Sequence, residues 1–275
     1  MLGTRDRPVA CLYLTGHRSR LAFPVTRVLD RFAWAPAATR DEVEAALIAA
    51  RTLAVVYLPY VPYGALPPRL MDGQTRPAGV CPVVAPSDWH TYSSGMPPTL
   101  RKALHRAEQR AARCGRRLRR SVLAAGETAE RLDELAAVEA RGHRCSGLLL
   151  SGKHAQFVRR VIRDLDAAGH VRTHVIEDRD GVGAYLIGFA ARRRYLLYTT
   201  ALAARCQPLA LGLLVLHDAI KGAVEGGEAV DIGNGSTRFK LRWATGVLQL
   251  ASFLQLPRAD NALVRHSPPP AEVFA

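Results

Sequence analysis

A run of small, uncharged residues stands at the expected start of a long apolar helix and has the features of a phosphate-binding loop. The helix is expected from about Leu209 to Val224, and the segment Gln207-Pro-Leu-Ala-Leu-Gly212 leads into it. Backbone N–H groups and the helix dipole bind anions at a helix N-terminus, and small residues such as Ala210 let a phosphate approach. Arg205 precedes the run and could pair with a phosphate. The alternative is a buried helix start in which the small residues serve only packing.

A second candidate group lies between residues 231 and 243. Asp231 ends an expected short strand, and the glycines at 233 and 235 permit a tight turn after it. Lys240 and Trp243 are three residues apart, so they share one face if this segment is helical. A lysine here could contact a phosphate or stabilise the oxyanion of a tetrahedral intermediate. The alternative is structural, with an ion pair between Asp231 and Arg242 and a tryptophan in the core.

The most strongly charged segment of the chain predicts a helix with a basic stripe. Thr99 is a good N-cap and Gly115 a good C′ residue for a helix between them. Residues 100–121 hold nine basic side chains and one acidic one, which supplies +8 of the net charge of +14. At about 100° per residue, five of these cations fall within a stripe about 80° wide, and an apolar stripe lies about 120° away. The five cations are Lys102, Arg106, Arg110, Arg113 and, if the helix runs on, Arg117.

Other elements must position these residues. Strands are expected at residues 9–14 and 53–61. Between them, the capping box Thr39-x-x-Glu42 begins a helix that runs through Ala50. Eight prolines then mark residues 62–98 as a long irregular link. Helices follow at 132–141 and from Ser151, and Asp180-Gly181 is a hairpin turn. The later elements are Val171–Glu177, Val182–Ala190, Tyr195–Leu202, Leu209–Val224, Ala229–Ile232, Ser236–Ala244 and Leu248–Leu256.

Length and composition indicate a folded α/β protein of 275 residues, 48% of them hydrophobic, which excludes disorder, collagen and coiled coil for the whole chain. We expect a small unit over residues 1–95, a larger domain over 96–256 and a tail over 257–275. Five separated cysteines without a C-x-x-C pair predict reduced thiols, no zinc site and a cytoplasmic location. The charged start is not a signal peptide, and the longest apolar stretch, Ala210–Leu216, is too short to span a bilayer.

The element order from residue 171 onward is similar to that of the GNAT acyltransferase fold. The run Asp231-Ile-Gly-Asn-Gly235, followed by Phe239-Lys-Leu-Arg-Trp243, resembles the D-x-G-x-G…[YF]-K-x-x-W segment of the BioF2-like subfamily. That subfamily includes cellulose-biosynthesis acetyltransferases and is similar to the Fem aminoacyltransferases. The basic helix, and Glu139 within Leu135–Arg141, resemble further segments of the same subfamily. The resemblance covers residues 97–256 and implies a mixed sheet with splayed strands at 195–202 and 229–232, preceded by a unit that would be a degenerate first GNAT half.

The resemblance also implies a donor site. GNAT enzymes hold the donor's pyrophosphate on a [QR]-x-x-G-x-[GA] segment. Here Gln207 and Gly212 match that pattern, whereas Ala210 replaces its first glycine. We therefore assign Arg205, Gln207, Ala210 and Gly212 to the donor site, and Lys240 to a phosphate or the oxyanion. The remaining donor-site candidates are Asp231, Arg242 and Trp243.

Amide formation also needs a base for the attacking amine and an acid for the leaving group. Tyr198 lies on the strand that normally carries GNAT catalysis and is the candidate acid, while Glu139 or His143 is the candidate base. A lone histidine or glutamate on a helix is more often simply solvated. Cys145 has no His/Asp motif around it, so a covalent mechanism is not expected.

The donor remains open at this point. The favoured hypothesis is an N-acyltransferase that uses acyl-CoA and an amine of a small molecule or glycan precursor, because Gln207 and Gly212 fit a pyrophosphate. The alternative donor is aminoacyl-tRNA, as in the Fem-like relatives, with the acceptor stem along residues 102–117. A non-catalytic nucleic-acid-binding protein would explain the pI near 10.2 but not the acyltransferase-like segment. The acceptor and the oligomeric state are not specified by the sequence.

Overall fold

The computed structural model describes residues 75–115, 117–142, 148–150, 152–191 and 193–255, and the backbone of short strands before residue 63. The chain divides into two compact units, Met1–Gly79 with Gln249–Ala275, and Val80–Leu248. This division differs from the expected boundary at residue 95, because Val83 and Val84 pair with a strand of the second unit. None of the described helices is long and apolar enough to cross a membrane.

In the first unit, β1 and β2 form an antiparallel pair, and the other strands follow the order β3-β4-β5-β12. Strand β5 confirms the strand predicted at residues 53–61. The strand predicted at 9–14 is described only in part, and the helix predicted at 39–50 and the tail lie outside the described residues. The bounds are β1 (Leu2–Gly3), β2 (Pro8–Ala10), β3 (Thr15–His17), β4 (Arg20–Ala22), β5 (Val55–Pro62) and β12 (Gly246–Gln255).

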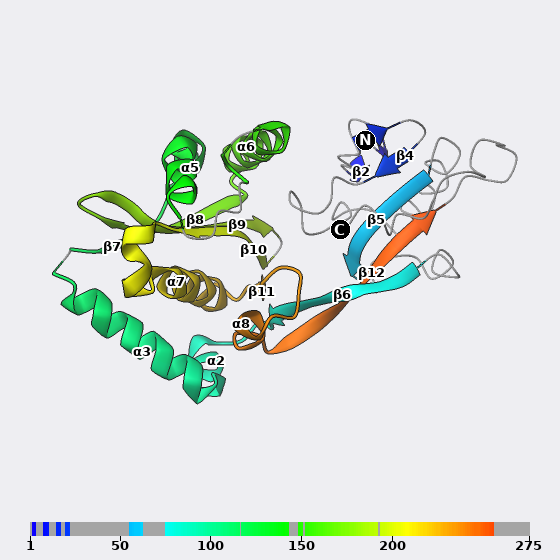
Figure 1. Cartoon of the computed structure of the whole chain (residues 1–275). Helices are drawn as coiled ribbons and strands as arrows, with labels where there is room; N and C mark the ends of the chain where they lie inside the picture. The colour runs from blue at the N-terminus through cyan, green and yellow to red at the C-terminus, as the bar shows by residue number, and fades with distance from the viewer. Residues whose placement is uncertain are drawn as a thin grey trace, which may run out of the picture. The chain divides into compact units, whose positions relative to one another are not determined.

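The second unit is built on a mixed sheet in the order β12-β6-β11-β10-β9-β8-β7, to which β12 contributes its first residues. Helices α3 and α7 lie on one side of this sheet and α5 and α6 on the other (Figure 1). The strands are β6 (Thr75–Val84), β7 (Arg119–Val122), β8 (Val171–Asp178), β9 (Gly181–Ala191), β10 (Arg194–Leu202) and β11 (Ala229–Asp231). The helices are α2 (Trp89–Gly95), α3 (Pro98–Arg113), α4 (Glu127–Glu130), α5 (Leu132–Ala140), α6 (Gly152–Ala167), the 3-10 helix η2 (Ala204–Leu209), α7 (Leu211–Glu225) and α8 (Arg238–Leu241).

The strand pair β10–β11 separates early. The two strands are parallel and pair from Arg194↔Ala229 to Leu196↔Asp231, after which β10 runs on to Leu202 while β11 has ended. On its other side β10 pairs antiparallel with β9, and the register shifts between Leu197 and Thr199. These pairings confirm the predicted hairpin and the splayed strands, and they place Tyr198 at a bulge just beyond the last paired position.

Helix α3 confirms the predicted amphipathic helix with two adjustments. It begins at Pro98 rather than after Thr99. Proline has no backbone N–H, but the first residue of a helix has no partner for that N–H within the helix, so proline is well tolerated there. It ends at Arg113, and Gly115 has a φ of +65°, a left-handed conformation that glycine adopts without strain. Arg117 is therefore not on the helix, whereas the apolar face that holds Leu100 and Leu104 is buried.

Two elements lie in the segment that the prolines mark as irregular, and that expectation is wrong. Strand β6 includes Pro82, whose carbonyl oxygen accepts a hydrogen bond from the N–H of Ile232, so its missing N–H costs nothing at this contact. Helix α2 starts at the N-cap Asp88, whose carboxylate accepts from the Thr91 N–H at 2.8 Å. Strand β7 and helix α4 were also not predicted, because their short sequences carry no clear periodicity.

A buried histidine lies where β8 packs against α7. His174 is 5% exposed, and its Nε2 atom has no hydrogen-bond partner in the described part of the chain. Its ring centroid lies 6.1 Å from that of Tyr195, and a Cβ on Gly222 of α7 would stand 3.8 Å from its Cε1 atom. Burial lowers the pKa of His174 to about 4; the Arg172 cation acts in the same direction and the Asp218 carboxylate opposes it. The imidazole is therefore neutral in the folded protein at neutral pH.

This neutral histidine predicts a defined acid instability. In the unfolded chain a histidine titrates near pH 6.5, so the unfolded state binds the extra proton between that pH and about 4. The stability that His174 contributes is complete above pH 6.5 and should fall by up to about 3 kcal/mol as the pH drops to about 4. Urea unfolding across this range should show a shallower loss for His174→Gln. Equal pH dependence in the two proteins would contradict the assignment.

Candidate active site

The opening between β10 and β11 brings two of the candidate residues, Tyr198 and Asp231, close together. Asp231 is the last residue of β11 and pairs with Leu196, and Tyr198 follows two residues later on β10. Helix α7 packs against β8, β9, β10 and β11, so its N-terminal loop belongs to the same part of the unit. The parallel pairing thus joins residues that are 35 positions apart in the sequence at one edge of the opening.

The predicted donor loop is η2 followed by the first turn of α7. Gln207 is exposed, and its carbonyl oxygen accepts from the Ala210 N–H at 3.1 Å. Ala210 is the N-cap of α7 and has φ 56° and ψ 36°, a left-handed conformation that costs a residue with a Cβ about 1 kcal/mol. This is the position at which the GNAT pattern has glycine, so the backbone supplies a physical reason for that preference.

Gly212 lies in the first turn of α7, where backbone N–H groups have no partner within the helix. It is partly exposed, and a Cβ built on it would meet no heavy atom within 4 Å. There is therefore open space next to the helix N-terminus, as the approach of a phosphate would require.

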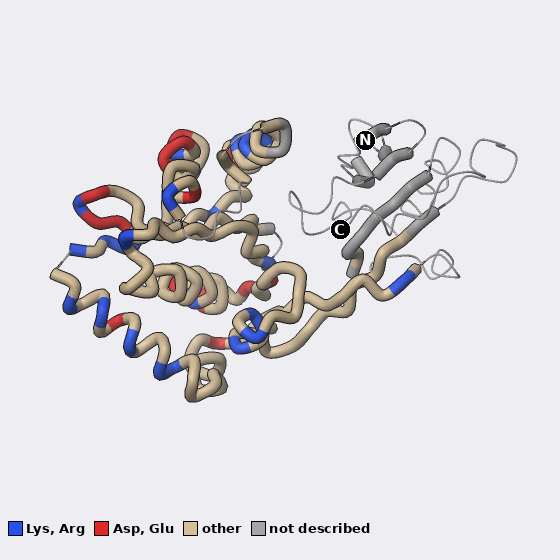
Figure 2. Tube along the Cα trace, viewed as in Figure 1, with Lys and Arg blue, Asp and Glu red and all other residues tan. Residues whose placement is uncertain are grey.

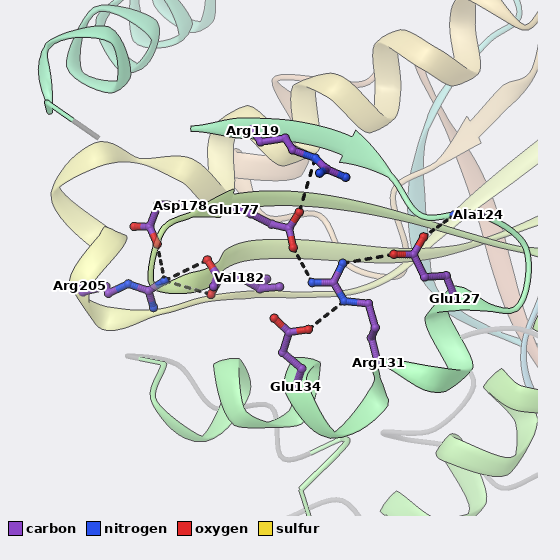
Figure 3. Close-up of polar contacts among 10 residues, drawn as sticks. Arg119, Ala124, Glu127, Arg131, Glu134, Glu177, Asp178, Val182 and Arg205 are labelled. Carbon is purple, nitrogen blue, oxygen red and sulfur yellow. Dashed lines mark hydrogen bonds and ion pairs between the residues drawn. The ribbon is translucent and has the colours of Figure 1, made fainter. Parts of the chain in front are cut away.

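Arg205 has protein partners, which argues for a structural role rather than a phosphate contact. Its Nη2 atom donates to the Asp178 carboxylate at 3.0 Å and to the carbonyl oxygens of Gly181 and Val182 (Figure 3). The Asp178 side chain is 1% exposed. Arg205 therefore fastens η2 to the β8–β9 hairpin.

A second arginine holds the same hairpin from the other side. Arg131, between α4 and α5, forms ion pairs with Glu127, Glu134 and Glu177, and Glu177 precedes Asp178 on β8 (Figure 3). The hydrogen bond to Glu134 is the largest cause that raises the pKa of Arg131. Together, these pairs link helices α4 and α5 through the hairpin to the donor loop.

The loop after β11 is folded back on itself. Asp231 is buried and accepts from the Cys81 thiol at 2.8 Å and from the Gly233 N–H at 3.0 Å. Gly233 and Gly235 have φ values of 81° and 100°, which allow the tight turn that the sequence predicts. The Lys240 ammonium donates to the Asn234 carbonyl oxygen at 2.6 Å, so it closes this turn.

The end of this segment is structural. Trp243 is 1% exposed, and its carbonyl oxygen accepts from the Tyr92 hydroxyl at 2.7 Å. The guanidinium of Arg242 lies 5.3 Å from the ring centroid of Phe239. These contacts favour the structural interpretation of Trp243, and they give Arg242 a ring partner that its sequence position did not indicate.

The acid–base candidates differ in their surroundings. Tyr198 is partly exposed, and its ring centroid lies 4.9 Å from that of Phe189. Glu139 is 1% exposed, and its carboxylate accepts from the backbone N–H groups of Leu148 and Leu149. Glu139 thus anchors the chain that follows α5, whereas His143 and Cys145 lie outside the described residues.

The basic helix α3 packs on α7 and on η2, the two elements that carry the donor loop. One flank is paired: Glu108 and Asp218 both bind Arg120 of β7. The opposite flank carries exposed cations that make no ion pair within the described residues, and Figure 2 shows the basic positions spaced along α3. These cations are Lys102, Arg106, Arg110 and Arg113. Arg117, beyond the helix, lines a hollow of about 650 Å³ with Arg119 and Asp178.

Residues 99–241, just over half of the chain, match the acetyltransferase (GNAT) domain family. The chain belongs to this family. The match spans α3, the donor loop and the Asp231 segment. It confirms the predicted GNAT fold and the predicted membership in a family of transferases. The BioF2-like subfamily stays a prediction.

Solved structures similar to this GNAT protein extend the fold to most of the chain. L-PGS from Bacillus licheniformis aligns over 91% of this chain and 82% of its own, with a TM-score of 0.58 and 12% identity. FemX aligns over 88% and 87%, with a TM-score of 0.58 and 11% identity. The C-terminal domain of a proposed lysylphosphatidylglycerol synthetase from Agrobacterium fabrum aligns over 84% and 76%, with a TM-score of 0.56 and 16% identity. At these identities the likeness establishes the fold alone, and no curated protein matches by sequence.

Two residues that build the site were missed from the sequence. Cys81 lies in the segment expected to be irregular, and nothing in its spacing indicates a contact with Asp231. Asp178 stands just before the Asp180-Gly181 turn, where a carboxylate often binds the turn's own N–H groups; it does accept from Asp180, but it also holds Arg205.

The open space at Gly212 gives the donor loop a direct test. Gly212→Ala and Gly212→Asp should both fold with Tm within about 2 °C of the wild type, because an acidic residue in the first turn even favours a helix. A donor phosphate on this turn would be repelled by the aspartate, so Gly212→Asp should lower acyl transfer at least about tenfold while Gly212→Ala stays close to wild type. Unchanged transfer by the aspartate variant would place the donor phosphates elsewhere.

Proposed function

We propose that this GNAT protein is an aminoacyltransferase that takes its acyl group from aminoacyl-tRNA and forms an amide on an amine acceptor. The observation that carries the proposal is the unpaired basic flank of α3, the helix that packs on the donor loop. The sequence alone slightly favours acyl-CoA. The preference changes because the residue expected to bind a phosphate, Arg205, is already engaged with Asp178.

The charges of α3 fit a long polyanion better than a compact one. Four consecutive stripe positions from Lys102 to Arg113 extend over three turns of helix, or about 16 Å. A nucleic-acid backbone offers phosphates along that whole length, whereas a single pyrophosphate reaches only one end of it. The acidic residue of α3, Glu108, lies on the other flank and is bound to Arg120.

The solved structures most relevant to this proposal are similar over nearly the full chain and include FemX and L-PGS. The Asp231–Trp243 segment resembles the BioF2-like subfamily, which is similar to the Fem aminoacyltransferases, and this resemblance supports aminoacyl-tRNA as the donor. The solved structures support the fold, the sequence resemblance supports the donor class, and neither identifies the acceptor.

The proposed reaction is attack of an amine nitrogen on the ester carbonyl carbon of the aminoacyl-tRNA. The C–N bond forms, the bond to the ribose oxygen breaks, and the amine loses a proton while the ribose oxygen gains one. Tyr198, at the bulge of β10, is the proposed acid for the ribose oxygen, and Lys240 is the proposed partner of the oxyanion. Glu139 is poorly suited as the base because its carboxylate accepts two backbone N–H groups.

Acyl-CoA is the second candidate donor, and one observation favours it. The space beside Gly212 at the start of α7 suits a pyrophosphate, and that chemistry needs no basic stripe. Transfer from aminoacyl-tRNA therefore requires the cations of α3, whereas transfer from acyl-CoA does not.

Charge reversal on the stripe separates the two donors. Arg106→Glu/Arg110→Glu should weaken transfer from charged tRNA at least about tenfold at low salt, and should flatten the slope of log affinity against log salt by about two. Use of acetyl-CoA, if any, should not change. The matched control is Arg160→Glu/Arg163→Glu on α6, across the sheet, since both double variants lower the net charge from +14 to +10.

Transfer and binding are measured as initial rates with total charged tRNA or acetyl-CoA, and by filter binding across a salt series. Equal losses in both double variants would mean that only overall charge matters. Acetyl-CoA turnover that survives the stripe reversal, with no transfer from charged tRNA, would replace the proposal by the second candidate.

A further inference from the structure

The segment from α8 to the start of β12 exposes apolar side chains at its surface. Among the described residues, four large apolar side chains are strongly exposed, and three of them lie within nine positions. These three are Phe239, Leu241 and Val247, at 45%, 42% and 46% exposure, and we call them the apolar tip. The fourth, Val122, is 52% exposed and stands on β7. Since isolated exposed apolar residues are ordinary, it is the closeness of these three along one segment of the chain that requires an explanation.

The apolar tip is set among positive charges. Arg238, Lys240 and Arg242 alternate with its first two members, and residues 232–248 contain no Asp or Glu (Figure 2). Apolar side chains that alternate with cations along one segment are complementary to a surface with an apolar interior and anionic head groups. An acidic protein would match the charges, but it would also need an apolar groove shaped to these three side chains, whereas a bilayer needs no such fit.

A nucleic acid fits this surface less well. Bases stack on open aromatic faces, and two members of the tip, Leu241 and Val247, are aliphatic. The aromatic member, Phe239, already has the Arg242 guanidinium 5.3 Å from its ring centroid. The polyanion stripe proposed above is on a different element, α3, so the two surfaces do not compete.

We propose that the apolar tip docks on an anionic phospholipid bilayer. Phe239, Leu241 and Val247 enter the interface while Arg238 and Arg242 contact lipid phosphates. Lys240 and Asp231 lie in the same segment, so docking brings the candidate active site to the membrane surface. If the proposed function holds, the amine acceptor is then carried by, or presented at, that surface.

The test uses the full chain and vesicles of phosphatidylcholine, either alone or with about a third of phosphatidylglycerol. Leu241→Ser/Val247→Ser removes two members of the tip without changing any charge, so it isolates insertion from electrostatic attraction. Val122→Ser is the control outside the tip, because it removes one apolar side chain that is more exposed than either Leu241 or Val247. Co-sedimentation is measured at low salt and at about 0.5 M salt, where exposed charges are strongly screened.

We expect the wild type and Val122→Ser to bind the anionic vesicles and to bind pure phosphatidylcholine much more weakly. The tip variant should bind the anionic vesicles at least about tenfold more weakly, with the larger difference at high salt. Equal binding by the tip variant and the wild type would overturn the proposal. The proposal would also be overturned if the wild type were a dimer and the tip variant a monomer, since the tip would then be a protein interface. Loss of RNA retention by the tip variant would overturn it as well, since the tip would then bind RNA.

Vesicle binding needs neither a donor nor turnover, so it fails or succeeds independently of the proposed function. Loss of docking with intact transfer to a soluble amine would remove this inference alone. Intact docking without transfer from any charged tRNA would remove the donor assignment alone.

Discussion

Strands β10 and β11 share three paired positions, and the rest of the candidate site depends on their early separation. Parallel pairing brings Asp231 beside Leu196, and β11 ends immediately afterwards, so within the described residues the following part of β10 has no strand partner on that side. The bulge at Tyr198 falls in this unpaired part. A buried sheet normally satisfies its backbone groups internally, so an opening of this kind is where a substrate can meet both side chains and backbone.

Ion pairs and short hydrogen bonds hold the two loops that border this opening. Arg205 fastens the donor loop to Asp178, and Arg131 braces the neighbouring Glu177 from α4 and α5. On the other side, Asp231 accepts from Cys81, and Lys240 closes the glycine turn at Asn234. Residues that look like ligands in the sequence thus serve partly as supports. Under the proposed function, this leaves the first turn of α7 and the unpaired flank of α3 to bind the anionic donor.

Much of the second unit could be predicted, because its helices and strands carry clear periodicity and caps: α3, α5, the β8–β9–β10 meander, α7 and the strand pair all follow the predicted order. Strand β6 could not be predicted, because prolines in a sequence argue against a strand. Here the strand forms because the carbonyl oxygen of Pro82, rather than an N–H, makes its hydrogen bond to Ile232. The partners of Arg205 and Glu139 were also beyond prediction, because Asp178 and the N–H groups of Leu148 and Leu149 meet them only after folding. Side-chain type indicates what chemistry is possible, whereas tertiary contacts decide which groups remain available.

The central claim is that the donor binds between β10 and β11, on the first turn of α7. Hydrogen exchange followed by mass spectrometry, with and without total charged tRNA, tests it most directly. We expect slowed exchange in residues 197–213 and 231–236 and along α3, with unchanged exchange in α6 on the far side of the sheet. Protection along α3 without any change in residues 197–213 and 231–236 would contradict the account, because the tRNA would then be bound away from the opening.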